Sequence, residues 1–141
     1  MGIVVDSYQF THSDHGSISK PIIYCHPSKE IYEQAISLNI PLAMELKKQG
    51  TAMMRTMRME QSIIKVLSAI PENSIIKDFD VMFHPDYQID VIKTLGNVYR
   101  KRQFSVIWPG RYEDGKLYYA EEGYKDYKTF EISNYDITVV I

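Results

Sequence analysis

Short apolar runs alternate with longer amphipathic segments along this chain. Compact apolar runs bounded by proline, glycine or polar residues predict buried strands at residues 22–25, 74–83, 104–108 and 136–141. Apolar residues at helical spacing predict helices that begin after Ser28 and that cover residues 60–70 and 86–103. Residues 3–10 and 40–46 suit two further short strands. This alternation predicts an α/β fold with three layers, in which helices cover a mostly parallel sheet.

Prolines and glycines set the expected boundaries. Pro41 disfavours a helical residue before it, so the helix after Ser28 should stop near Asn39. Asp114-Gly115 lies between two strand-like stretches and predicts a C-terminal β-hairpin with a two-residue turn. Residues 111–131 therefore form a hairpin followed by a polar, aromatic segment, and residues 1–20 form a strand and a polar loop.

The segment between Lys47 and Met59 contains four of the seven methionines. We interpret it as a loop packed over the edge of the core. The alternative is an adaptable, methionine-rich surface for a partner, because methionine side chains are flexible and polarizable.

Composition narrows the class of protein. With 141 residues, of which 45% are hydrophobic, the chain fits one globular domain with a real core. The net charge of −2 gives no global field for wrapping nucleic acid, and the single cysteine excludes an internal disulfide and a multi-cysteine zinc site. The chain shows neither a signal peptide nor an apolar run that could span a membrane, so we expect a soluble cytoplasmic protein.

A strand, a tight polar turn and a lysine before a helix give residues 21–32 the layout of a phosphate-binding loop. The turn consists of Cys25, His26, Pro27, Ser28 and Lys29. It has no glycine to let backbone N–H groups close around a phosphate, and proline removes one donor. The lysine is followed by glutamate where serine or threonine would hold magnesium. A plain strand-to-helix turn is the favoured interpretation.

Acidic residues at the end of a neighbouring strand would bind magnesium in a hydrolytic site. Asp78 and Asp80 follow the strand predicted from Ser74. Both also fit ordinary strand-end charges.

Histidines and the cysteine offer a different chemistry. Zinc accepts nitrogen and sulfur ligands of the kind supplied by His12, His15, Cys25, His26 and His84. The spacing lacks a second close pair, so a metal protein or small enzyme remains an alternative hypothesis. Neighbouring residues in a strand point to opposite faces, which favours Cys25 as a core thiol over a nucleophile activated by His26.

A basic run and the C-terminal tyrosines suggest contacts with a partner or with nucleic acid. The candidates are Arg100, Lys101, Arg102, Arg111, Tyr112, Tyr124 and Tyr127. Cations at a helix C-terminus also complement the helix dipole, and aromatic residues also stabilise hairpins by cross-strand pairing. The structural interpretations are favoured, with a DNA-binding module as an alternative.

Residues 40–141 carry a pattern that resembles a known family. The pattern comprises a hydrophobic strand that leads to Asp80 and Phe83, a proline-containing turn into a helix with Ile89-Asp90, the run Trp108-Pro109-Gly110, and the hairpin segments 115–121 and 123–127. It resembles the BrxF family, the small P-loop proteins of BREX phage-defence systems, especially of the third type. The resemblance implies a core similar to that of AAA-type ATPases.

The departures from this family change the expected function. The family has a Walker A loop where this chain has residues 25–29. With the strand aligned on Phe83, Asp80 falls at the second acidic position and Lys77 falls where the magnesium-binding aspartate would be. We therefore transfer no catalytic residue and expect no cofactor.

The resulting hypothesis is a non-catalytic, BrxF-like interaction subunit with a degenerate P-loop. It would dock onto a larger defence complex in the cytoplasm. The partner would be a protein, with DNA and a homo-oligomer as further options and no membrane contact. A phage-encoded mimic of a host defence subunit is a further alternative.

Overall fold

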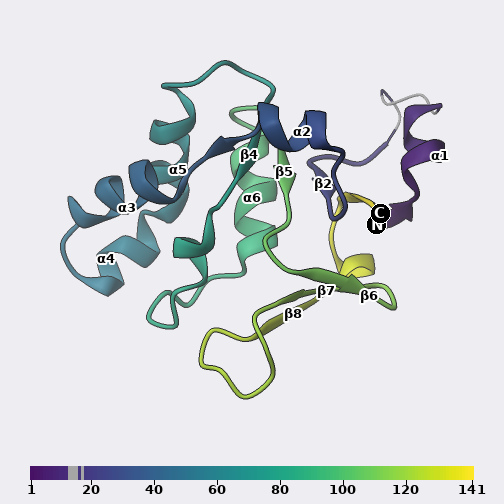
Figure 1. Cartoon of the computed structure of the whole chain (residues 1–141). Coiled ribbons are helices and arrows are strands. Elements are labelled where there is room, and N and C mark those ends of the chain that lie inside the picture. Colours follow the sequence, from purple (N-terminus) through teal and green to yellow (C-terminus); the bar gives the residue numbers. More distant parts are fainter. Residues whose placement is uncertain (13–15, 17) are drawn as a thin grey trace.

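The computed structural model contains a parallel sheet and a smaller antiparallel sheet, and describes residues 1–12, 16 and 18–141 (Figure 1). The parallel sheet has the strand order β1-β9-β2-β5-β4-β3, and every pair in it is parallel. Its strands are β1 (Ile3–Val5), β2 (Ile22–Tyr24), β3 (Ile36–Ser37), β4 (Ser74–Lys77), β5 (Phe104–Ile107) and β9 (Thr138–Val140). The antiparallel sheet consists of β6 (Arg111–Glu113), β7 (Lys116–Tyr119) and β8 (Lys128–Glu131). The α/β class with a mostly parallel sheet is thus confirmed.

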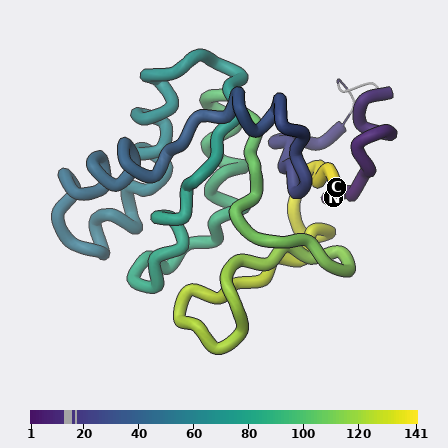
Figure 2. Tube along the Cα trace, in the orientation of Figure 1, coloured from purple at the N-terminus to yellow at the C-terminus, as the bar shows by residue number. Residues whose placement is uncertain are grey.

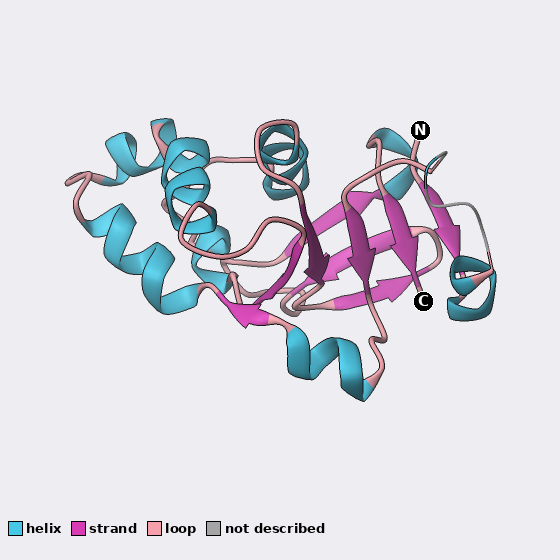
Figure 3. Cartoon of the chain, turned by 90° about the horizontal axis from the view of Figure 1, so that it is seen from above, coloured by secondary structure: helices cyan, strands magenta, loops and turns pink. Residues whose placement is uncertain are grey.

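Helices cover both faces of the parallel sheet. They are α1 (Ser7–Thr11), α2 (Lys29–Gln34), α3 (Asn39–Lys47), α4 (Ala52–Met57), α5 (Met59–Leu67) and α6 (Val91–Tyr99), with short 3₁₀ turns η2 (Asp80–Phe83) and η3 (Ile132–Asn134). The crossover from β2 to β3 runs outward along the sheet, and the crossovers from β3 to β4 and from β4 to β5 run back. Because such crossovers are right-handed, α2 lies on one face and α5 and α6 lie on the other (Figure 3).

One cluster of buried side chains connects the parallel sheet to the helices and to the antiparallel sheet. Ile23, Val106 and Val139 come from the three central strands and are fully buried. Leu95 of α6 and Leu117 of β7 are equally buried and belong to the same cluster. The apolar runs and the apolar helix faces predicted from the sequence therefore supply the buried core.

Residues 111–131 lie below the parallel sheet in the view of Figure 2, where their trace runs from green to yellow-green. Asp114 and Gly115 have φ values of 49° and 78°, the left-handed conformation that a two-residue hairpin turn requires at both positions. The Tyr119 ring of β7 stacks on Phe83 with centroids 3.7 Å apart. The predicted hairpin is confirmed, and the segment after it contains a third strand, β8, that was not predicted.

The N-terminal segment differs from its prediction. Only Ile3–Val5 of residues 3–10 is a strand, and α1 follows directly. The Asp6 side chain accepts a hydrogen bond from the Gln9 backbone N–H, and the Gln9 side-chain oxygen Oε1 accepts one from the Asp6 backbone N–H. This capping box starts the helix and ends the strand. His15, one of the candidate metal ligands, lies outside the described residues.

The strand predicted for residues 40–46 is wrong, because these residues belong to α3. Pro41 lies in the first turn of this helix, where a backbone N–H has no acceptor within the helix, so proline is tolerated there. Leu42 and Leu46, one turn apart, are both buried against the core. The strand at this end of the sheet is instead the two-residue β3, which lies just before α3 in the sequence.

The loop predicted between Lys47 and Met59 is also wrong in part, because it contains α4. The Thr51 hydroxyl accepts a hydrogen bond from the Met54 N–H and caps this helix. Other boundaries are shorter than predicted: α2 ends at Gln34, β4 ends at Lys77 and α6 begins only at Val91. Among the residues that the structure describes, no helix combines the length and the apolar character needed to cross a membrane.

Candidate functional site at the carboxyl edge of the sheet

Ligands of open α/β sheets bind outside the carboxyl ends of the strands, so this edge is the first place to examine. Here the ends of β2, β4 and β5 lead into residues 25–28, 78–79 and 108–110. A pocket of about 300 Å³ lies at this edge. It is lined by Tyr32, Lys77, Asp78, Asp80, Ile107, Trp108, Pro109 and Gly110. The two stretches that the sequence analysis compared with nucleotide-binding motifs thus lie at one edge of the sheet, although residues 25–29 do not line the pocket.

The turn at residues 25–29 is a simple link between β2 and α2. The Cys25 N–H donates to the Val140 carbonyl at 2.9 Å, which continues the sheet by one residue. The Ser28 hydroxyl accepts from the Ile31 N–H at 3.3 Å and caps a helix of six residues. The Lys29 amine lies 3.9 Å from Glu33, one turn along the same helix. These groups serve the helix itself, and they form no cradle for a phosphate.

Lys77 carries the positive charge of the pocket. Its Nζ lies 3.8 Å from the centroid of the Tyr32 ring, which comes from α2 and also lines the pocket. This cation–π contact holds the amine over the edge of the sheet. A lysine at this place repels a divalent cation, and Lys77 stands at the sequence position that the resemblance assigns to a magnesium-binding aspartate.

Asp80 is half-buried, and both of its oxygens are engaged. The Tyr119 hydroxyl donates to Oδ2 at 2.9 Å, and Asn39 Nδ2 donates to Oδ1 at 3.5 Å. Asn39 also accepts a hydrogen bond from the Val81 N–H at 3.1 Å. Burial, together with this carboxylate, raises the pKa of Tyr119, which keeps the phenol protonated as a donor. The carboxylate therefore ties η2 to the hairpin and to α3.

The Trp108-Pro109-Gly110 turn has a structural reason. The Trp108 indole N–H donates to the Tyr118 carbonyl at 2.9 Å. A Cβ atom at Gly110 would lie 1.8 Å from that same carbonyl oxygen, so only glycine fits. The turn joins the parallel sheet to the antiparallel sheet, and it leaves one wall of the pocket without a side chain at Gly110.

Cys25 and the three histidines within the described residues, His12, His26 and His84, do not form a reactive group. Burial raises the pKa of the Cys25 thiol to about 12, so it carries no thiolate near neutral pH. His12 stacks on Tyr8 of α1, and His84 accepts a hydrogen bond from the Asp86 N–H. His26 is exposed at the end of β2. The described part of the chain contains no group of three or more histidine, cysteine or acidic side chains that could hold a metal ion.

The basic and aromatic candidates are distributed over several elements. Arg102 donates to the Ile70 carbonyl at 2.7 Å and is partly buried, so it fastens the end of α6. Arg111 lies over the Tyr118 ring at 4.5 Å, within the hairpin. The Tyr112 hydroxyl accepts from the Gly115 N–H in the hairpin turn.

The remaining members of this basic and aromatic set are more accessible. Arg100, Lys101 and Tyr124 are exposed, whereas Tyr127 is half-buried. The structural interpretation thus fits the more buried members.

Three residues at this edge were missed by sequence reasoning, namely Tyr32, Asn39 and Tyr119. They come from α2, α3 and β7, and nothing in their local sequence marks them as neighbours of Lys77 or Asp80. Comparison of the chain with family models, with curated proteins and with solved structures gives no match.

Proposed function

We propose that this chain is a non-catalytic, BrxF-like interaction subunit with a degenerate P-loop core, which docks onto a larger phage-defence complex in the cytoplasm. The strand order supports the P-loop likeness. The resemblance requires that the strands before the phosphate loop and before the acidic residue end at the same edge of a parallel sheet, where ligands bind. Here β5 lies between β2 and β4, the strands that precede residues 25–29 and Asp78.

The observation that carries the proposal is that the chain's own groups occupy the carboxyl edge. Lys77 lies on the Tyr32 ring, the Asp80 carboxylate accepts from Tyr119, and Ser28 caps α2. A Mg²⁺–nucleotide needs free carboxylates and a ring of backbone donors at these places. The scaffold supports binding between proteins better than it supports hydrolysis.

Exposed apolar side chains on two consecutive helices support an interaction role. Ile40 and Met44 of α3 are 74% and 63% exposed, and Met53 and Met57 of α4 are each 71% exposed. Within each pair the residues are four apart, so they lie on one side of their helix. Exposed methionines and isoleucines of this kind are typical of surfaces that bind other proteins. The partner in a defence complex follows from the resemblance.

Calorimetric titration with ATP and Mg²⁺ tests the loss of nucleotide chemistry. We expect no saturable heat and no phosphate release. Micromolar binding with turnover would refute the proposal. A nucleotide bound without turnover would retain the docking role and contradict only the closed edge.

Co-expression with the other components of a BREX system of the third type tests the docking role. We expect the chain to co-elute with a larger component in size-exclusion chromatography. Met44→Glu combined with Met53→Glu should abolish co-elution, because the substitutions place charges on the apolar helix faces. Tyr8→Glu is the matched control, since Tyr8 is 72% exposed but lies on α1, apart from α3 and α4 (Figure 1). A chain that elutes alone in the presence of every component would contradict the proposal.

A further inference from the structure

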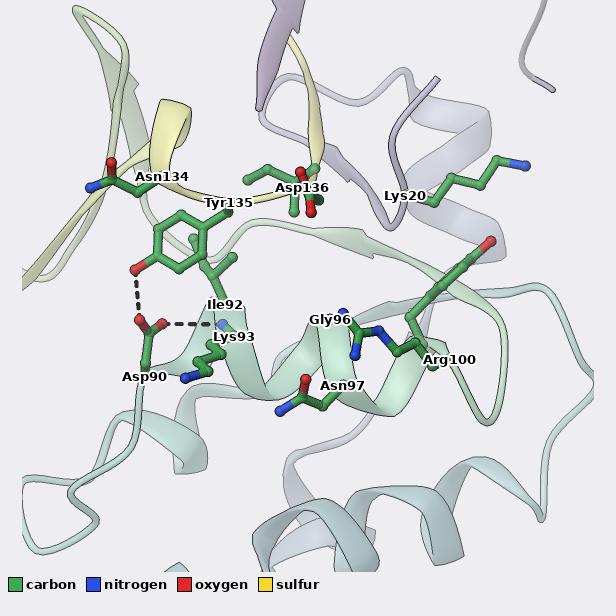
Figure 4. A pocket seen from close by; sticks show the side chains of 12 residues that line it. Lys20, Asp90, Ile92, Lys93, Gly96, Asn97, Arg100, Asn134, Tyr135 and Asp136 are labelled. Atoms are coloured by element: carbon green, nitrogen blue, oxygen red, sulfur yellow. Dashed lines mark hydrogen bonds between the residues drawn. The ribbon is translucent and has the colours of Figure 1, made fainter. Parts of the chain in front are cut away.

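A second and larger hollow, of about 690 Å³, runs along α6 (Figure 4). One wall is α6 itself, and the other is the segment from Asn134 to Ile137 that leads into β9. Figure 4 shows Asp90 and Tyr135 at one end and Lys20 and Arg100 at the other. None of its lining residues belongs to the carboxyl-edge pocket. Its volume falls within the roughly 300–1,000 Å³ typical of small-molecule sites.

The helix contributes a continuous polar stripe to this groove. Lys93, Gly96, Asn97 and Arg100 follow the spacing i, i+3, i+4 and i+7, so they share one side of α6. The apolar residues of the helix are buried against the core. Asn97 Nδ2 donates to Glu60 Oε2 of α5 at 3.0 Å, whereas the exposed side chains of Lys93 and Arg100 are available to a ligand.

Both carboxylates of the groove already have partners. Asp90 accepts from the Lys93 N–H at 3.1 Å through one oxygen and from the Tyr135 hydroxyl at 2.7 Å through the other. Asp136 pairs with the amino group of Met1. That amino group, together with Arg100, holds the pKa of the Asp136 carboxyl below its usual range.

The cations of the groove are unpaired by comparison. Among the described residues, none forms a hydrogen bond or an ion pair with the side chain of Lys20 or Lys93, and Arg100 has only the longer-range attraction to Asp136. The lining thus carries three positive and two negative side chains, and both negative ones are already engaged. The remaining charge favours an anion.

Gly96 gives the ligand room to approach the helix. A Cβ atom placed there would meet no other atom within 4 Å, so the glycine is not required by packing. Glycine is less favourable than alanine in a helix interior, which makes its presence at the middle of α6 a local cost. Figure 4 shows the Arg100 guanidinium turned back along the helix toward this glycine.

We propose that this groove binds a small organic phosphate monoester. The phosphate lies over Gly96 between Lys93 and Arg100, and a hydroxyl-bearing body reaches the Asn134 side-chain amide and the Oδ1 atom of Asn97, whose Nδ2 already donates to Glu60. A phosphate monoester carries about two negative charges near neutral pH, which matches the two cations of the stripe. The guanidinium group binds such an oxyanion through two parallel hydrogen bonds.

Backbone NMR shifts measured during titration with inorganic phosphate, ribose 5-phosphate and AMP test the proposal. We expect saturable shifts of amides in residues 93–100 and 134–137, with tighter binding of the two esters than of inorganic phosphate. Binding at the carboxyl edge would instead shift amides near residues 25–30 and 77–80, so the two sites are distinguished in one experiment. If none of the probes shifts the groove amides at millimolar concentration, the proposal is wrong.

Variants distinguish specific binding in the groove from nonspecific attraction of anions by the positive charge of the surface. Lys93→Glu should weaken ester binding by at least roughly tenfold, as expected for the loss of one charged hydrogen bond. Gly96→Leu should block the ester while its helix becomes more stable, which excludes unfolding as the cause. Lys101→Glu is the matched control, because Lys101 is exposed just after the C-terminal end of α6 but does not line the groove. Equal weakening by Lys101→Glu, or unchanged binding in Gly96→Leu, would overturn the proposal.

Discussion

Tyr119→Phe tests whether Asp80 has a structural role or the role of a metal ligand. The substitution removes the hydroxyl that donates to Asp80 at 2.9 Å and keeps the ring that stacks on Phe83 at 3.7 Å. It leaves a half-buried carboxylate with one weak partner, Asn39 at 3.5 Å. The packing loss is therefore small, and the change reports the hydrogen bond.

The expected loss follows from the charge of the acceptor. A hydrogen bond to a charged group contributes about 1.5–3 kcal/mol to stability, so we expect the free energy of unfolding to fall by about 2 kcal/mol. For 141 residues, an unfolding entropy of about 2.1 cal/mol/K per residue amounts to roughly 0.3 kcal/mol/K. The melting temperature should then drop by about 7 °C.

Urea unfolding followed by circular dichroism measures the loss, and a double-mutant cycle with Asp80→Ala assigns it to the pair. The two single variants should be similarly destabilised, and the double variant should be little worse than either. Tyr124→Phe is the control, because that ring is 68% exposed and should change stability by less than about 0.5 kcal/mol. Full additivity of the two changes would refute the structural role of Asp80.

Three further predictions concern stability. Gly110→Ala should destabilise the fold by about 1–3 kcal/mol, because the added Cβ would meet the Tyr118 carbonyl. Gly96→Ala lies in an open helical position and should stabilise the fold by up to about 1 kcal/mol. Thermal melts compare the two variants. The raised pKa of Tyr135, caused first by burial and then by Asp90, predicts stability that is present below pH 10 and declines as the pH rises above it, and Tyr135→Phe should reduce that decline in urea titrations. The lowered pKa of Glu45, caused first by its hydrogen bond with a lysine of α5, predicts stability that is present above pH 4.5 and is lost as the pH falls; Glu45→Gln should flatten this acid dependence, and an unchanged slope would contradict the assignment.

The parts of the fold that could be predicted are those with local signals. The Asp114-Gly115 turn requires left-handed backbone at both positions, and short apolar runs such as residues 104–108 fit only a buried strand. The prediction of a strand at residues 40–46 was wrong because proline is compatible both with the end of one helix and with the first turn of the next. Only the burial of Leu42 and Leu46 decides between these readings, and burial is a tertiary property.

The candidate site shows the same limit. The missing glycines between Cys25 and Lys29 and the lysine at position 77 are visible in the sequence, so the departure from a phosphate loop was predictable. The bond from Tyr119 to Asp80 spans 39 residues, and no periodicity or motif encodes it. The groove along α6 could not be predicted, because Lys93, Asn97 and Arg100 have the pattern of an ordinary solvated helix face. Only the tertiary fold places residues 134–137 opposite them.

The position of β9 has a consequence for the order in which the chain can fold. The last strand in the sequence inserts between β1 and β2, with Val139 opposite both Val4 and Ile23. Before residues 138–140 leave the ribosome, β1 has no partner strand and one edge of β2 is open. Contacts between such distant segments form slowly, and open strand edges promote aggregation. Completion of the central sheet therefore waits for residues 138–140, and until they are synthesised the nascent chain depends on protection of the open edge of β2.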